Sequence, residues 1–175
     1  MKTKKGLALY VAQGAVIAAL YATLTILQNI LLPGSASMAV QFRVAEVLTL
    51  APLFTPAAIP GLTIGCIVAN ISSLSALGAY DLVFGSLASL LAALAVYWLR
   101  NVRFKGLPLL AALMPALMNG IIVGFELDFF FIEPIGFDFA DFLLQGSLVA
   151  LGELGVVFIL GLPLARIIET RKILR

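Results

Sequence analysis

The chain has no histidine and a single cysteine, Cys66, among its 175 residues. One cysteine cannot form a disulfide within the chain. Without imidazole there is also no histidine metal site, no Cys-His dyad and no serine triad that uses histidine. Only carboxylates are left for chemistry, so we expect neither a bound metal nor another cofactor.

The sequence also lacks a GxxxxGK[ST] phosphate loop, so we expect no ATP hydrolysis by the chain itself. Charge is scarce: 11% of residues are charged, against 62% that are hydrophobic, and the mean hydropathy is +1.13. Several apolar runs approach the ~20 residues that cross a bilayer. This composition excludes an ordinary soluble domain and predicts an all-α integral membrane protein, surrounded by lipid and without a nucleic-acid partner.

Apolar runs separated by proline, glycine and polar residues predict one domain, residues 1–175, with six membrane-spanning helices. The expected ranges are about 7–32, 41–54, 57–76, 81–99, 107–125 and 142–165. The second range is short, because about 14 residues cross only where the bilayer thins or inside a helix bundle.

Basic residues predict the orientation. Ten of the eleven fall into three groups, at residues 2–5, 100–105 and 166–175. If there are six spans, an even number of spans precedes each group, so all three groups lie on the same side of the membrane. The positive-inside rule then predicts that both termini and the loop around Arg103 are cytoplasmic. The membrane is expected to be the plasma membrane. The loop at 126–141, which is acidic and rich in phenylalanine, then faces outside.

Polar side chains within the predicted spans concentrate in the outer half. Random placement would not gather amides and carboxylates in one leaflet, whereas a pocket that opens to the outside would. We therefore predict a substrate-binding site formed by Gln41, Arg43, Glu46, Asn70, Asp81, Asn119, Gln145 and Glu153.

Structural alternatives stay open for most of these residues. Arg43 and Glu46 are three residues apart and could form an ion pair, or Arg43 could reach the lipid headgroups. Asp81 could cap its helix, and the amides could join helices by hydrogen bonds. Glu153 favours function more strongly, because its span holds no basic residue to pair with it.

Small residues predict close helix contacts. Gly61 and Gly65 repeat every four residues on the third span, and packing within the bundle is the preferred interpretation of that pair. On the first span a similar repeat is widened by further alanines. We predict that this stripe, formed by Ala15, Ala18, Ala19 and Ala22, contacts a partner subunit.

Three segments resemble a known family: QFRVAEVLTLAP at 41–52, PGLTIGCIVANI at 60–71 and YDLVFGSLASLLA at 80–92. Together they resemble the QueT family, the substrate-binding S components of energy-coupling factor (ECF) transporters for queuosine precursors. The resemblance continues more loosely through MPALMNGIIVG at 114–124, while the sixth span and the outer loop match in character only.

This resemblance implies an S-component-like bundle that captures a 7-deazaguanine such as preQ1, preQ0 or queuine from outside. A transmembrane T component, packed against the alanine stripe, and two cytoplasmic ATPases would supply the energy. The guanine-like edge of such a ligand offers N–H donors to a carboxylate and a carbonyl to an amide. Glu46, Asp81, Glu153 and the outer amides suit this role in kind.

The predicted site holds three carboxylates and one guanidinium, so it favours a neutral donor-rich or cationic ligand over an anion. The phenylalanines from 129 to 139 could close over a flat heterocycle or form an interfacial belt. The main alternative function is a self-sufficient secondary transporter in which Glu153 cycles protons. A third interpretation is a membrane enzyme with a hard metal at Asp128, Glu133, Asp138 and Asp141.

Overall fold

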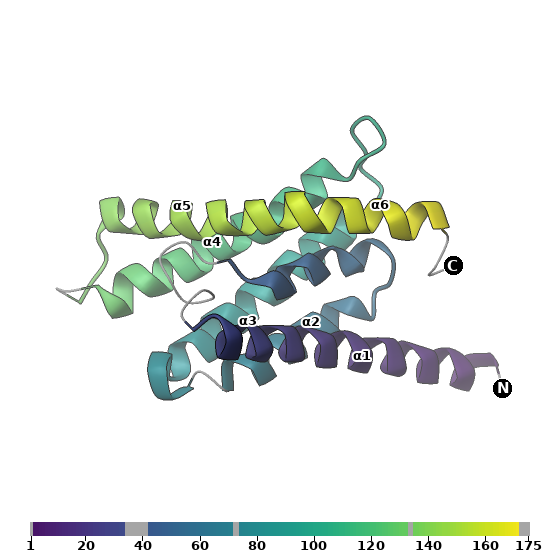
Figure 1. Cartoon of the computed structure of the whole chain (residues 1–175), viewed down its shortest axis with the longest axis horizontal. Coiled ribbons are helices and arrows are strands. Elements are labelled where there is room, and N and C mark those ends of the chain that lie inside the picture. The colour runs from purple at the N-terminus through teal and green to yellow at the C-terminus, as the bar shows by residue number, and fades with distance from the viewer. Residues whose placement is uncertain (1, 34–41, 72–73, 133–134, 172–175) are drawn as a thin grey trace.

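The chain is helical throughout most of the computed structural model, which describes residues 2–33, 42–71, 74–132 and 135–171. Successive segments run in alternating directions along the long axis of the molecule (Figure 1). The expected all-α fold is confirmed. The elements are α1 (Lys2–Leu31), the 3₁₀-helix η1 (Val44–Leu53), α2 (Ala58–Ile71), α3 (Leu74–Trp98), α4 (Leu109–Phe131), α5 (Phe139–Val156), the π-helical turn η2 (Val157–Gly161) and α6 (Leu162–Arg171).

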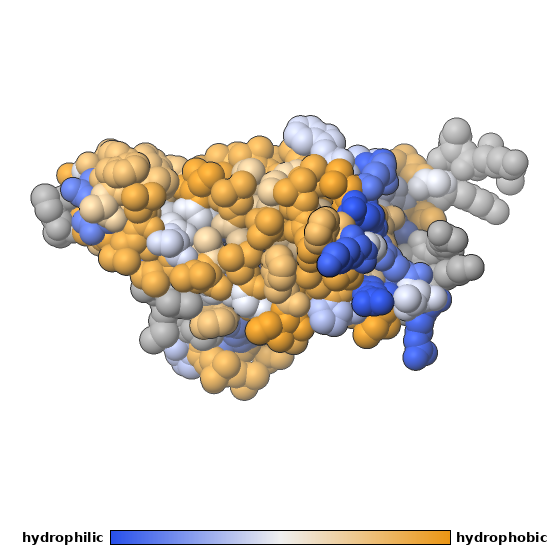
Figure 2. Space-filling model, turned by 90° about the horizontal axis from the view of Figure 1, so that it is seen from above, coloured by the Kyte–Doolittle hydropathy of each residue, from blue (hydrophilic) through white to orange (hydrophobic). Residues whose placement is uncertain are grey.

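The surface of the molecule is suited to lipid. In the view of Figure 2 it is mainly apolar, and hydrophilic residues gather towards the end where both termini lie. Within the described residues, four helices are long and apolar enough to cross a membrane: Gly6–Leu31, Ala79–Trp98, Leu109–Phe131 and Phe139–Arg171. The two shorter apolar helices are η1 and α2. Six crossings and cytoplasmic termini stay predictions.

Several helix boundaries differ from the predicted ones, and two of these differences concern polar residues. The helix expected to begin at 81 begins at Leu74, since Gly78 costs only about 1 kcal/mol inside a helix and does not end it. Asp81 therefore lies in the helix interior, and its interpretation as an N-cap is wrong. The helix expected to end at 125 continues to Phe131, so Glu126 and Asp128 belong to α4 rather than to the outer loop.

The short helix η1 lies at the centre of the bundle, where it contacts α1, α2, α3, α4, α5, η2 and α6. A 3₁₀-helix rises about 2.0 Å per residue, so ten residues extend about 20 Å instead of the about 15 Å of an α-helix. That length is still short of the ~30 Å hydrocarbon core. The position of η1 carries its polar first turn into the protein interior, where Ala45 and Glu46 are buried.

The last predicted span forms one long helical segment with an internal irregularity. α5, η2 and α6 follow one another without a break from Phe139 to Arg171. In the π-helical turn, the N–H of Leu162 donates to the carbonyl of Val157, one residue further back than in an α-helix. Turns of this kind are frequent at functional sites, and this one begins four residues after Glu153.

Small residues allow α1 and α2 to approach closely. A Cβ added at Gly61 would lie 2.8 Å from the carbonyl oxygen of Gly14, and one added at Gly65 would lie 2.9 Å from that of Ala18. The glycine pair thus packs within the bundle, as expected. Ala22 is buried and Ala18 half-buried at this contact, whereas Ala15 and Ala19 are exposed. The alanine stripe is therefore divided, and only its Ala15–Ala19 edge is open on the surface.

The variant Gly65→Ala is expected to destabilise the protein by about 1–3 kcal/mol, because the added methyl group would clash with the α1 backbone and with the Cβ of Tyr21. Thermal unfolding in detergent measures the effect. Gly6→Ala is the matched control, since a Cβ at Gly6 meets nothing within 4 Å. Equal melting temperatures for the two variants would contradict the close α1–α2 contact.

Candidate functional site

Glu46 is the central carboxyl of a buried polar group, in the half of the bundle that the sequence predicts to face outside. It lies in the first turn of η1 and is 1% exposed. The hydroxyl of Tyr21 on α1 donates a hydrogen bond to Glu46 Oε1 over 2.5 Å. Glu46 Oε2 has no hydrogen-bond partner among the described residues. One oxygen of this buried carboxyl is thus held by the protein, and the other is an open acceptor.

Arg43 lies immediately before η1 and does not form the ion pair that its spacing allowed. The ion pair in the described part of the chain joins Arg103 to Glu169 and does not involve Arg43. The Nε of Arg43 is buried without a hydrogen-bond partner there, yet Arg43 interacts electrostatically with Glu46 and Asp81. The backbone around it is held by Gln28, whose side chain donates to the Phe42 carbonyl and accepts from Val44 N–H.

Glu153 and Asn119 form a second buried pair, between α5 and α4. Asn119 Nδ2 donates to Glu153 Oε1 over 2.5 Å, and both side chains are buried. Glu153 Oε2, like Glu46 Oε2, has no hydrogen-bond partner among the residues described. Glu153 lies close enough to Glu46 and Arg43 to interact electrostatically with them. Two helices and η1 therefore bring these polar groups to one place.

Asn70 and Asp81 connect α2 to α3. Asn70 Nδ2 donates to the backbone carbonyl of Asp81 over 2.8 Å, so this amide serves at least partly to join the two helices, as the structural alternative allowed. The carboxyl of Asp81 is buried, and its Oδ2 has no hydrogen-bond partner in the described part of the structure.

Glu126 belongs to the same region, although the sequence analysis did not select it. It is 2% exposed, its Oε2 has no hydrogen-bond partner among the described residues, and it interacts electrostatically with Asp81 and Arg43. It was missed because the helix was expected to end one residue earlier. Its spacing of seven from Asn119, two helical turns on the same face, was the available signal.

These groups define the outer polar cluster, which is named for the side of the membrane that the sequence predicts for it. Its members come from α1, η1, α3, α4 and α5, and four of its carboxyl groups each have one oxygen without a partner among the described residues. An unpaired buried acceptor costs free energy unless a ligand or water supplies a donor. The members of the cluster are Tyr21, Arg43, Glu46, Asp81, Asn119, Glu126 and Glu153.

Comparison with known proteins assigns the chain to a family of membrane transporters. Residues 11–170 match the sequence model of a family described as QueT transporter. The chain belongs to the QueT transporter family. No curated protein and no solved structure is significantly similar to it. The family supports a role in membrane transport, and its match covers every residue of the outer polar cluster.

Two predicted site residues of this QueT family member, Asn70 and Gln145, are not members of the cluster. Gln145 on α5 is half-buried, and in the described part of the chain no hydrogen bond links its side chain to the cluster. Gln41 lies outside the described residues. The substrate-binding role of Gln41, Asn70 and Gln145, like that of the cluster residues, stays a prediction.

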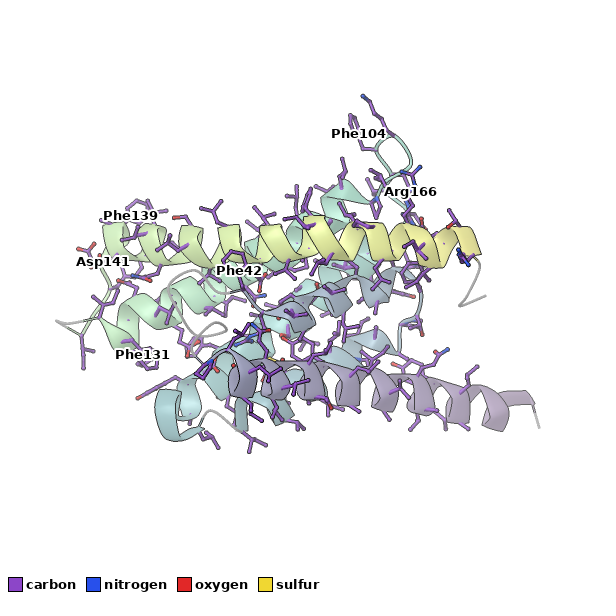
Figure 3. The ribbon with its side chains drawn as sticks, in the orientation of Figure 1. Phe42, Phe104, Phe131, Phe139, Asp141 and Arg166 are labelled. Carbon is purple, nitrogen blue, oxygen red and sulfur yellow. The ribbon has the colours of Figure 1, made fainter. Side chains whose placement is uncertain are left out.

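The end of the molecule opposite the two termini is aromatic, as Phe131 and Phe139 in Figure 3 illustrate. Phe125 stacks on Phe129 with ring centroids 5.5 Å apart, and it also contacts Phe137 beyond α4. The side chain of Asp138 caps α5, and the backbone N–H of Asp138 donates to the buried carboxyl of Asp128. Within the described residues, which exclude Glu133, no group of three potential ligands could hold a metal ion.

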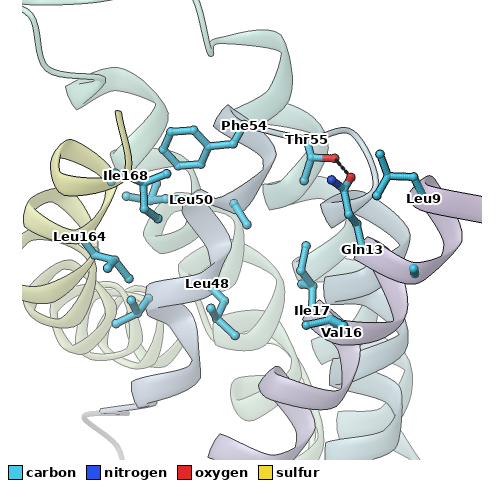
Figure 4. Close-up of a pocket in the computed structure, with 15 residues that line it drawn as sticks. Leu9, Gln13, Val16, Ile17, Leu48, Leu50, Phe54, Thr55, Leu164 and Ile168 are labelled. Atoms are coloured by element: carbon cyan, nitrogen blue, oxygen red, sulfur yellow. Dashed lines mark hydrogen bonds between the residues drawn. The ribbon is translucent and has the colours of Figure 1, made fainter. Parts of the chain in front are cut away.

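A separate groove of about 560 Å³ lies nearer the opposite end, between α1 and α6 (Figure 4). Its floor is η1, and its walls include Val16, Leu48 and Leu164. The lining is mainly apolar, and its polar pair, Gln13 and Thr55, is joined by a 2.8 Å hydrogen bond. This hydrogen bond gives the polar side chain of Gln13 on α1 a partner within the protein. No carboxyl group is among the described residues that line the groove, so the outer polar cluster is the better candidate for a donor-rich substrate.

Proposed function

We propose that the chain is the S component of an ECF-type importer and captures a queuosine precursor, a 7-deazaguanine such as preQ1, preQ0 or queuine, from the extracellular side. The observation that carries this proposal is the outer polar cluster, in which buried carboxyl groups from four elements each present one open oxygen. Such an arrangement is costly in an empty membrane protein and is offset when a ligand supplies donors.

The chemistry of the cluster suits a guanine-like edge. Glu153 Oε2 and Glu46 Oε2 can accept N–H groups of the heterocycle, while the open Nε of Arg43 can donate to its carbonyl oxygen. Each carboxylate is fixed by a protein donor, from Tyr21 in one case and Asn119 in the other. Because these side chains are already held in one orientation, less conformational entropy is lost when the ligand binds.

The position of the cluster supports access from outside. The ends of α1 and α6 and the loop with Arg103, where the basic groups of the sequence fall, gather at one end of the molecule (Figures 1 and 3). The outer polar cluster lies towards the other end, near the aromatic residues. With the basic end in the cytoplasm, as the positive-inside rule expects, the cluster faces the extracellular side.

The energy would come from partners, a transmembrane T component and two ATPases, because the chain has no phosphate loop. α1 is the least covered of the long helices: 17% of its apolar window is buried, against 44–50% for the others. Its exposed Ala15 and Ala19 leave room for another helix to approach closely. We place the T component on this edge.

Uptake into liposomes tests the proposal. Protein reconstituted with a T component and two ATPases is expected to accumulate 7-deazaguanine only when ATP is supplied on the ATPase side. The chain reconstituted alone, with an imposed proton gradient, is the control. Accumulation by the chain alone would refute the S-component function and favour the secondary transporter in which Glu153 carries protons.

A further inference from the structure

A distinct corner of the outer polar cluster lies where α3 and α4 face each other. Asp81 and Phe84 are three residues apart on α3, and Glu126 and Phe130 are four apart on α4, so each carboxyl shares a helix face with an aromatic ring. The two faces meet, since the rings of Phe84 and Phe130 have centroids 5.7 Å apart. Tyr80 stacks on Phe130 at 4.1 Å. Two carboxyl groups and several aromatic rings therefore share this corner.

Both carboxyl groups are buried and incompletely paired. Asp81 Oδ2 and Glu126 Oε2 have no hydrogen-bond partner among the described residues. The two groups interact electrostatically with each other and with Arg43. Arg43 forms no ion pair with either of them in that part of the chain, and Glu46 and Glu153 interact with it as well. One guanidinium is thus shared among four carboxyl groups, which leaves the corner short of positive charge.

A primary ammonium group supplies what this corner lacks. It carries one positive charge and three N–H donors, which can reach two open carboxylate oxygens at once. The faces of the adjacent rings add cation–π attraction. A neutral substituent without donors, such as a nitrile, would leave both oxygens unpaired and the repulsion between the carboxylates in place.

We infer that Asp81 and Glu126 form a subsite for a primary ammonium group of the ligand, beside the part of the cluster that holds the heterocycle. This inference rests on the proposed function and narrows the substrate class to 7-deazaguanines that carry an aminoalkyl substituent. The competing explanation is that the two carboxyl groups share a proton and have no contact with ligand. It predicts no preference between charged and neutral ligands.

The test compares two ligands that differ at this substituent, 7-aminomethyl-7-deazaguanine and 7-cyano-7-deazaguanine, by calorimetry on the full chain in detergent. The wild type is expected to bind the aminomethyl compound at least about tenfold more tightly, the scale of one charge-assisted hydrogen bond. In Glu126→Gln the preference is expected to disappear, because binding of the aminomethyl compound alone weakens. Asp141→Asn, the same change of charge in the first turn of α5, is the control and keeps the preference.

Equal affinity of the wild type for the two compounds would overturn the ammonium subsite and leave the proposed function intact. So would a Glu126→Gln variant that weakens both compounds equally. Should that variant not fold, the wild-type ratio decides, and Phe130→Leu, which removes one ring face, is expected to reduce it. Binding of neither compound to the wild type would instead overturn the proposed function, and the subsite with it.

Discussion

Replacing Glu153 with glutamine is expected to weaken 7-deazaguanine binding by about 1.5–3 kcal/mol, or roughly tenfold to a hundredfold in Kd. Asn119 holds one oxygen of this carboxyl, so the open Oε2 is the atom available to ligand. Glutamine keeps the shape of the side chain and removes the negative charge that strengthens hydrogen bonds from the heterocycle. Isothermal titration of the purified protein measures the change.

Glu169→Gln is the matched control for this experiment. It makes the same chemical change at the opposite end of the molecule, where Glu169 pairs with Arg103 over 2.5 Å. Its affinity for ligand is expected to equal that of the wild type, since loss of a partly exposed ion pair lowers the stability of the fold only slightly. A folded Glu153→Gln variant with unchanged affinity would remove Glu153 from the substrate site.

The variant Ala19→Leu is expected to abolish ATP-driven uptake while leaving ligand affinity unchanged. Ala19 is exposed on α1, so a larger side chain fits the isolated protein, but it would keep a partner helix from approaching closely. Liposome uptake and calorimetry on the same preparation separate the two effects. Ala18 is less suitable, because it packs against Gly65 inside the bundle.

Ser147→Leu provides the control for Ala19→Leu. Ser147 is also exposed, on α5, and its hydroxyl bonds only to carbonyls of its own helix. Uptake by this variant is expected to match the wild type. Normal uptake by Ala19→Leu would show that the T component packs elsewhere, and loss of ligand binding would show that Ala19 supports the fold.

The sequence predicted the number and order of the apolar segments well, because hydropathy identifies segments that avoid water, whether they face lipid or the protein interior. It did not predict how the chain ends each helix. α3 begins at Leu74 rather than at 81, and α4 ends at Phe131 rather than at 125. The 3₁₀ form of η1 was also not predicted from the sequence.

The members of the outer polar cluster were predicted in part, while their role in substrate binding stays a prediction. Five predicted residues gather in the structure: Arg43, Glu46, Asp81, Asn119 and Glu153. They could be predicted because carboxylates, amides and guanidinium groups are rare in apolar spans and are easily recognised there. Tyr21 was missed, since a tyrosine in an apolar run looks like an ordinary core residue and its hydroxyl partner cannot be read from spacing. The Arg43–Glu46 ion pair was allowed by spacing, yet Glu46 bonds to Tyr21 instead.

The most direct test of the substrate site is an experimental structure of the chain bound to 7-aminomethyl-7-deazaguanine. We predict the heterocycle within hydrogen-bond distance of Glu46 Oε2 and Glu153 Oε2, inside the outer polar cluster. The ligand found in the apolar groove beside Val16, Leu48 and Leu164, with the carboxyl groups of the cluster untouched, would contradict the proposed site.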